Sequence, residues 1–320
     1  LADKLYFLCE LSWEMLSTDQ MALSYRSFPE RIRQFFGDAV RSDTELDHWH
    51  YDMMGQTMLS RNEHGEYSPA HRSFLEFFVA YKLVAELGCL ASDFVAIAQD
   101  QSGLDPTQAA KPYVWSDYFT YYYHTHRASL QTFFQEPLTQ LEQTLGHLPL
   151  SKALVDLMVP MLGLSEGPSE DLGGEVSVER KLFNTLSVAR ESPQVCSSYL
   201  VGNLMTLLLK LSSLSLQSKD FSNSVIRGAD FTDASLRDTD FSGAQFENCL
   251  FPQGWSGDLS VAFSPNGELL AIVDSTGEIS VRDVTKGEQI WHLNGHTDWI
   301  RALAFDVDSQ LKKPRRVSNR

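Results

Sequence analysis

A bulky apolar residue returns at every fifth position in the stretch GADFTDASLRDTDFSGAQFENCLF, residues 228–251. The centres of these units are Phe231, Leu236, Phe241, Phe246 and Phe251. A helix repeats near 3.6 residues and a half-buried strand repeats at 2, so neither element gives a period of five. A chain that turns a corner after each unit does, because every central side chain then points to one axis. The pattern predicts a narrow square coil.

The register extends backwards over three more units and gives eight consecutive apolar centres, with Leu216, Phe221 and Ile226 added. A second inward position lies two residues before each centre. In the later six units the residues at this position are all small: Ser224, Ala229, Ala234, Thr239, Ala244 and Cys249. The first two units, with Leu214 and Lys219 there, depart from the pattern.

These units resemble the pentapeptide-repeat family, whose A-[DN]-L-x-x units stack into a right-handed quadrilateral β-helix. The resemblance implies such a solenoid over residues 213–253. Eight units make two square coils, which form a spacer or a short scaffold. Each unit of a repeat stack contacts only its neighbours, so we expect the ends to need caps.

Composition limits the other possibilities. The chain has 320 residues and a formal net charge of -16, which argues against a nucleic-acid partner because phosphate binding needs clustered Lys and Arg. Its four cysteines lie far apart without a C-x-x-C pair, which favours a reducing cytoplasm.

The apolar run at residues 198–216 contains Asn203 and Lys210, so it predicts a buried helix rather than a membrane span. The chain does not begin with Met, and we expect it to be a piece of a longer protein.

Residues 254–311 contain short β-rich runs separated by turn signals such as Pro265-Asn266-Gly267. They predict a four-stranded meander that resembles one WD-repeat blade, with Gly295-His296 at the expected place and the first strand of a second blade ending at Phe305. Arg282-Asp283 stands where the family has Trp-Asp. The resemblance implies an incomplete β-propeller, since closure needs roughly four to eight blades.

The tail, residues 312–320, holds five basic residues and no acid. The blade pattern stops there, which indicates a truncated chain or a reading frame lost near residue 312. We expect a disordered, solvated end; an arm that binds DNA or a membrane surface is the alternative.

Residues 1–90 predict three helices, over 2–16, 28–37 and 44–56, followed by a hairpin that turns at His64-Gly65 and a helix that ends at Gly88. This order describes a winged helix. The junction EYSPAHRSFLEFFVA resembles the end of the winged-helix domain in NACHT-type (STAND) signalling NTPases, where the pattern is close to F-x-H-x-S-F-x-E-F-x-A-A. The residues that match are His71, Ser73, Phe74, Glu76, Phe77, Phe78 and Ala80, while Pro69 replaces an aromatic residue.

The resemblance implies a role for His71, which in that family donates to the β-phosphate of bound ADP and holds the resting state. The alternative is a histidine that bonds the backbone at a helix start. No G-x-x-x-x-G-K-[ST] occurs in the chain, so ADP or ATP would be held by an upstream domain and we expect no cofactor and no enzymatic activity here.

Residues 91–212 predict helices throughout, with Ser151 as a cap and a flexible loop at 165–175. By position only, they correspond to the helical arm of NACHT proteins. Two H-x-H pairs, His48/His50 and His124/His126, raise the possibility of a metal site. The first pair falls in a helical pattern that separates the two rings. The second belongs to an aromatic run without a further ligand at the usual spacing.

Together these patterns predict a multi-domain α+β chain: winged helix, helical arm, solenoid, blade and tail. The predicted function is the regulatory and sensor-linking part of a cytoplasmic, nucleotide-switched signalling protein that oligomerises when active and binds an unknown protein on its propeller. Two alternatives stay open. One is a self-standing acidic pentapeptide protein that mimics DNA, and the other is a metal-dependent hydrolase built on the histidine pairs.

Overall fold

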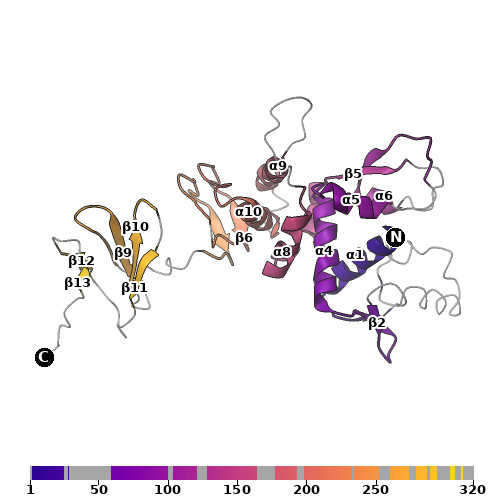
Figure 1. Cartoon of the computed structure of the whole chain (residues 1–320), viewed down its shortest axis with the longest axis horizontal. Helices are drawn as coiled ribbons and strands as arrows, with labels where there is room; N and C mark the ends of the chain where they lie inside the picture. Colours follow the sequence, from indigo (N-terminus) through magenta and orange to yellow (C-terminus); the bar gives the residue numbers. More distant parts are fainter. Residues whose placement is uncertain are drawn as a thin grey trace. The chain divides into compact units, whose positions relative to one another are not determined.

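The computed structural model describes residues 2–24, 28, 59–99, 104–120, 128–163, 177–192, 198–232, 234–251, 260–273, 279–286, 289–293, 303–306 and 311–312 (Figure 1). The chain divides into two compact units, Leu1–Asp230 with Ala234–Cys249, and Phe231–Asp233 with Leu250–Arg320. Both contain β-strands, and the helices lie in the first unit, so the chain is a mixed α and β protein.

Two long helices pack together in the first unit: α1 (Ala2–Ser17) and α4 (Arg72–Glu86). Leu5, Leu8 and Cys9 of α1 are buried, as their helical spacing predicts. Helix α4 is buried from Val79 to its end at Glu86, and Gly88 follows it with a φ of 64°, which suits a residue without Cβ.

A three-stranded antiparallel sheet lies beside these helices, in the order β1 (Leu23–Ser24), β3 (Glu66–Pro69), β2 (Leu59–Arg61). The predicted hairpin is present, and its turn is held by Asn62 Oδ1, which accepts from the backbone N–H of His64 and Glu66. The helices predicted over 28–37 and 44–56 lie outside the described residues, apart from Phe28, so the winged helix stays a prediction.

The next segment corrects the expectation that residues 91–212 are helical throughout. Two strands form a parallel pair: β4 (Lys111–Val114) and β5 (Leu130–Phe134). Along the chain they alternate with three helices, in the order α5 (Ser92–Gln99), β4, α6 (Trp115–Thr120), β5, α7 (Leu138–Gln143). Both strands are rich in aromatic and β-branched residues, which favour a pleated surface. Tyr113 and Phe133 are buried, and the Phe133 ring lies 5.5 Å from that of Trp115, so the pairing contributes to the core.

Three further helices complete the helical part: α8 (Lys152–Met161), α9 (Val178–Glu191) and α10 (Leu200–Leu211). Ser151 caps α8 as predicted, because its side chain accepts from Leu154 N. Helix α10 is buried on all sides from Leu200 to Leu209, which confirms the predicted buried helix. None of the helices in the described part of the chain is long and apolar enough to cross a membrane. The loop predicted at 165–175 lies outside those residues.

The five-residue units follow α10, and the chain pairs with itself at a spacing of 20 residues. Strands β6 (Val225–Arg227) and β7 (Gln245–Glu247) are parallel, with Ile226 opposite Phe246, and Asp220 bridges Asp240 in the same sense. Twenty residues are four units. Left-handed backbone recurs between units, at Ser218, Asn223, Gly228, Asp238, Gly243 and Asn248. These corners explain the period, because Gly, Asn and Asp tolerate positive φ at low cost.

The predicted apolar column is present in the first turn of units and is open in the second. Leu216, Phe221, Ile226 and Phe231 have no exposed surface. Leu236 and Phe241 are half-buried, and Phe246 and Phe251 are 37% and 42% exposed. Rings 20 residues apart stack on each other, with centroids 5.6 Å apart for Phe221 and Phe241.

The second unit contains the predicted four-stranded antiparallel meander, in the order β11-β10-β9-β8 (Figure 1). Its strands are β8 (Ser260–Phe263), β9 (Leu269–Val273), β10 (Ile279–Asp283) and β11 (Gln289–Leu293). Ala271, Val273, Ile279 and Val281 form its core, against which Phe305 of β12 (Ala304–Phe305) packs. Strand β12 pairs with β13 (Leu311–Lys312). Gly295-His296 and the tail beyond Lys312 lie outside the described residues.

Candidate functional site

His71 occupies the cap position at the start of α4. Its backbone is extended, with φ -149° and ψ 144°, and its Nδ1 accepts a hydrogen bond of 3.1 Å from Ser73 N. Ser73 Oγ lies 2.7 Å from the same nitrogen. The imidazole therefore satisfies one of the backbone N–H groups that a helix start leaves without an intrahelical partner.

This hydrogen bond fixes the tautomer of the neutral ring. Because Nδ1 accepts from a backbone N–H, it carries no proton, and the proton of the neutral imidazole is on Nε2. The side chain is exposed, and Nε2 has no hydrogen-bond partner in the part of the chain that the structure describes. The structure thus contains the backbone-bonded histidine that was the alternative reading. The Nδ1 bond to the backbone leaves Nε2–H free of a partner in the described residues, so capping of α4 and donation to a phosphate are compatible. The phosphate role of His71 stays a prediction.

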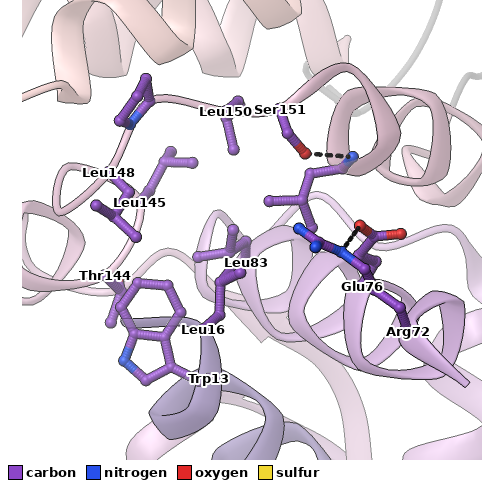
Figure 2. Close-up of a pocket in the computed structure, with 12 residues that line it drawn as sticks. Trp13, Leu16, Arg72, Glu76, Leu83, Thr144, Leu145, Leu148, Leu150 and Ser151 are labelled. Carbon is purple, nitrogen blue, oxygen red and sulfur yellow. Dashed lines mark hydrogen bonds and ion pairs between the residues drawn. The ribbon is translucent and has the colours of Figure 1, made fainter. Parts of the chain in front are cut away.

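A pocket opens beside the first turns of α4, among α1, α4, the 144–151 segment and α8 (Figure 2). Its volume is about 80 Å³. The walls are apolar side chains: Trp13, Leu16, Leu83, Leu145, Leu150 and Leu154. Arg72 and Glu76 line it as well, and Arg72 Nε donates to Glu76 Oε1 over 3.1 Å. The site can accept a small apolar group next to one charged pair.

A buried cluster of charges joins α1 to α4 further along both helices. Lys82 Nζ donates to Glu10 Oε1 at 2.5 Å and to Glu86 Oε1 at 2.7 Å. Trp115 Nε1 also donates to Glu10 Oε1, and Lys82 Nζ lies 5.6 Å from the centroid of the Trp115 ring. All three charged side chains are at least 96% buried. One cation therefore serves two carboxylates in the core.

Burial and charge act in opposite directions on Glu86 and Lys82, and the pKa of both groups is raised as a result. Burial raises the pKa of Glu86, and Lys82 opposes this only in part. Burial lowers the pKa of Lys82, but Glu10 and Glu86 more than compensate, so its pKa is raised. Glu86 Oε2 has no hydrogen-bond partner among the described residues. The cluster fixes the packing of α1 on α4 and has no access to an external substrate.

The three cysteines in the described part of the chain show no nucleophilic activation. Burial raises the pKa of Cys9 well above its ordinary value and raises that of Cys89 to about 11. Cys9, Cys89 and Cys249 are free, and Cys196 lies outside the described residues.

Within the described ranges, no three His, Cys, Asp or Glu side chains are grouped as metal ligands. Both H-x-H pairs, His48/His50 and His124/His126, lie outside those ranges, so the metal hypothesis is not tested.

The helices α9 and α10 cover the first turn of five-residue units. Arg190 Nε donates to Ser224 Oγ over 2.9 Å, Nη1 donates to Asp220 O, and the guanidinium carbon lies 5.0 Å from the centroid of the Phe221 ring. Asp230 N donates to Thr206 Oγ1 of α10. At Gly202 an added Cβ would lie 1.9 Å from Arg227 O, so only glycine permits this approach. These contacts form the cap that a repeat stack needs at its end.

The sequence patterns located His71 but missed the pocket and the charge cluster. A signal for the cluster was present, because Lys82 and Glu86 stand inside the otherwise apolar run VAYKLVAELG. Charged residues four apart on a buried helix face can pair with each other, and their burial indicates a polar cluster in the core. The partner Glu10 lies 72 residues away, which local spacing does not show.

Comparison with known proteins supports the repeats. Residues 220–251 match the model of pentapeptide repeats, with eight copies. The chain is 48% identical over 307 residues to "Uncharacterized WD repeat-containing protein alr3466" of Nostoc sp. strain PCC 7120, a match that covers 94% of this chain and 19% of that protein. A second Nostoc protein, "Uncharacterized WD repeat-containing protein alr2800", is 31% identical over 41% of this chain and 10% of its own length.

A shorter match covers 14% of this chain and 6% of "Probable serine/threonine-protein kinase PkwA" of Thermomonospora curvata, at 50% identity over 44 residues. The chain thus spans about a fifth or less of each of these curated relatives. It contains pentapeptide repeats and is similar to WD repeat-containing proteins.

Proposed function

We propose that this chain is the regulatory and sensor-linking part of a nucleotide-switched signalling protein of the NACHT type, and that it acts through protein–protein contacts and conformational gating. The observation that carries the proposal is the geometry of His71. It stands at the start of α4 in the matching sequence pattern; its side chain is exposed, Nδ1 accepts from the backbone, and the neutral ring therefore carries its proton on Nε2.

The arrangement of segments supports the same role. In this proposal residues 1–90 form a winged helix, residues 91–212 an arm, residues 213–253 a two-coil quadrilateral β-helix, and residues 254–311 the start of a WD-repeat propeller. The parallel pairing at a 20-residue spacing supports the β-helix. The open four-stranded meander and the WD repeats named in both Nostoc relatives support the blade and a protein ligand for the propeller.

The proposed mechanism rests on two ligands that favour different conformations of the protein. In the resting state His71 donates from Nε2 to the β-phosphate of ADP that an upstream domain holds. A protein that binds the propeller favours a second geometry in which this donor is withdrawn, and the population moves toward an open form that oligomerises. The chain itself supplies no catalytic group in this scheme. Three free cysteines among the described residues are compatible with a cytoplasmic location.

The test uses the longest natural protein that carries this segment, purified with its bound nucleotide. The variant His71→Asn keeps a side-chain oxygen that can cap α4 and removes the imidazole Nε2–H donor, because the amide N–H group of Asn lies closer to the backbone than Nε2 does. A hydrogen bond to a charged group contributes about 1.5–3 kcal/mol, so we expect ADP to dissociate about 10–100 times faster than from the natural protein.

His64→Asn is the matched control, because His64 is an exposed histidine of the hairpin turn with no side-chain hydrogen bond in the described part of the chain. Its ADP release should equal that of the natural protein. Equal release rates for the His71 and His64 variants, or purification without any bound nucleotide, would overturn the proposal.

A further inference from the structure

We propose that the pocket between α1, α4 and α8 is a docking site for a protein segment that inserts one aliphatic side chain and pairs an adjacent carboxylate with Arg72. The site goes beyond the nucleotide contact of His71, because it uses different side chains and a different partner. Figure 2 shows its walls converging on one small space, with Arg72 and Glu76 beside it.

The size of the pocket limits what can enter. Its volume of about 80 Å³ corresponds to two or three water molecules at roughly 30 Å³ each. A leucine- or valine-sized group fits this space, whereas a nucleotide or a drug-sized ligand needs about 300 Å³ or more. The pocket is therefore too small for the ADP of the proposed function and suits a single branched side chain.

The walls supply apolar contact and few hydrogen bonds. Leu83, Leu145 and Leu154 are at most 5% exposed and form the inner part. The hydroxyls of the lining have partners within the chain: Thr144 Oγ1 donates to Gln140 O, and Ser151 Oγ accepts from Leu154 N. A polar occupant would lose its hydration without replacement, so an aliphatic one is favoured.

The charge beside the pocket selects the neighbour of that side chain. Arg72 is 68% exposed, while its partner Glu76 is 15% exposed, so the accessible charge of this pair is positive. Only Nε of Arg72 is engaged with Glu76, and its two Nη groups have no partner in the ranges that the structure describes. A carboxylate complements them with two parallel N–H donors.

The rim extends the apolar surface beyond the pocket. Leu148 is 38% exposed and Pro149 is also exposed, although both line the opening. A peptide backbone that crosses this rim would cover them while its side chain fills the pocket. This rim distinguishes a protein segment from a free aliphatic acid, which would leave it uncovered.

The experiment titrates the full chain with a blocked tetrapeptide, glycyl-leucyl-aspartyl-glycine, while the methyl groups of Leu83, Leu148 and Leu154 are followed by NMR. One aliphatic side chain and one exposed ion pair predict a dissociation constant of about 1 mM. Replacing the leucyl group by alanyl should weaken binding about tenfold, and replacing aspartyl by asparaginyl about threefold.

Arg72→Gln tests the charge without changing the core. It should weaken binding of the aspartyl peptide about threefold and leave binding of the asparaginyl peptide unchanged. Arg180→Gln, an exposed site on α9 outside the pocket, is the matched control and should change neither. Three outcomes overturn the proposal: no methyl shift up to 10-fold above the predicted constant of about 1 mM, equal affinity of the aspartyl and asparaginyl peptides, or free isovalerate binding as tightly as the peptide.

Discussion

At the scale of single residues, the chain places ionic groups where an apolar side chain would be the default. Lys82, Glu10 and Glu86 lie in the core between α1 and α4, and each is almost completely buried. Such a cluster is weak evidence for stability, because desolvation offsets much of the attraction. It is strong evidence that the partners depend on one another, since removal of one leaves an uncompensated charge in the core.

Replacing the cation tests this dependence. Lys82→Met leaves two carboxylates buried without a positive partner, and we expect the free energy of unfolding to fall by about 3–5 kcal/mol in urea titrations. The double variant Lys82→Met/Glu86→Gln should lose less than the single variant, because one of the two charges is then gone. A loss as large in the double variant as in the single one would contradict this account.

The raised pKa of Glu86 predicts a pH dependence. A carboxyl group whose pKa is higher in the folded protein than its ordinary 4.5 binds a proton more tightly when folded. Its contribution to stability is complete below about pH 4.5 and is lost as the pH rises through the folded pKa. Glu86→Gln should therefore gain stability relative to the natural chain between pH 5 and pH 8.

The comparison is made by urea unfolding at both pH values. Glu63→Gln, at an exposed turn position, serves as the control and should show a constant difference from the natural chain. A constant difference for Glu86→Gln as well would show that Glu86 does not titrate in this window.

At the scale of elements, the coil depends on the helices that cover its first turn. Arg190 of α9 reaches two groups of the coil, Ser224 Oγ and Asp220 O, and lies over the Phe221 ring. Helix α10 approaches so closely that Gly202 has no room for a methyl group against Arg227 O. Within the first unit, the two helices therefore pack directly on the five-residue units that they contact.

Arg190→Met keeps most of the aliphatic length of the side chain and removes both hydrogen bonds. We expect a loss of about 1–3 kcal/mol in the free energy of unfolding, because Ser224 and Asp220 lose a charged donor. Arg180→Met, at an exposed position of the same helix, should change stability by less than about 0.5 kcal/mol. Equal effects of the two substitutions would mean that α9 does not hold the coil through Arg190.

Gly202→Ala gives a prediction opposite to helix propensity. In an open helix this change stabilises by about 0.5–1 kcal/mol. Here the new Cβ would meet a backbone oxygen at 1.9 Å, so α10 must move away from the coil. We expect the free energy of unfolding to fall by about 1–3 kcal/mol, as is typical of overpacking, and the thermal midpoint to fall with it. An unchanged or higher midpoint in calorimetry would show that the approach is looser than described.

The elements also show what a sequence can predict. The five-residue units and the strands of the meander were predictable, because each is specified by side chains and turn residues within a few positions. The pairing of β4 with β5 was not, since its partners are joined by a long connection and neither strand alternates clearly. The same limit applied to Lys82 and Glu10, 72 residues apart, and to the pocket, whose walls come from α1, α4 and α8.

At the scale of the whole molecule, two compact units share one continuous repeat. The first unit contains the helices and most of the coil, and the second contains the meander. The exposed apolar side chains of the meander, such as Phe263 at 62% and Trp291 at 48%, belong to an open sheet.

The central claim is that the chain returns beside itself every 20 residues, with the rings of Phe221 and Phe241 stacked at a centroid distance of 5.6 Å. The most direct measurement is the nuclear Overhauser effect between ring protons of these two residues in an otherwise deuterated chain. We expect a strong cross-peak, and a second one between Phe231 and Phe251, whose centroids lie 5.1 Å apart. The absence of both cross-peaks in a folded sample would contradict the account.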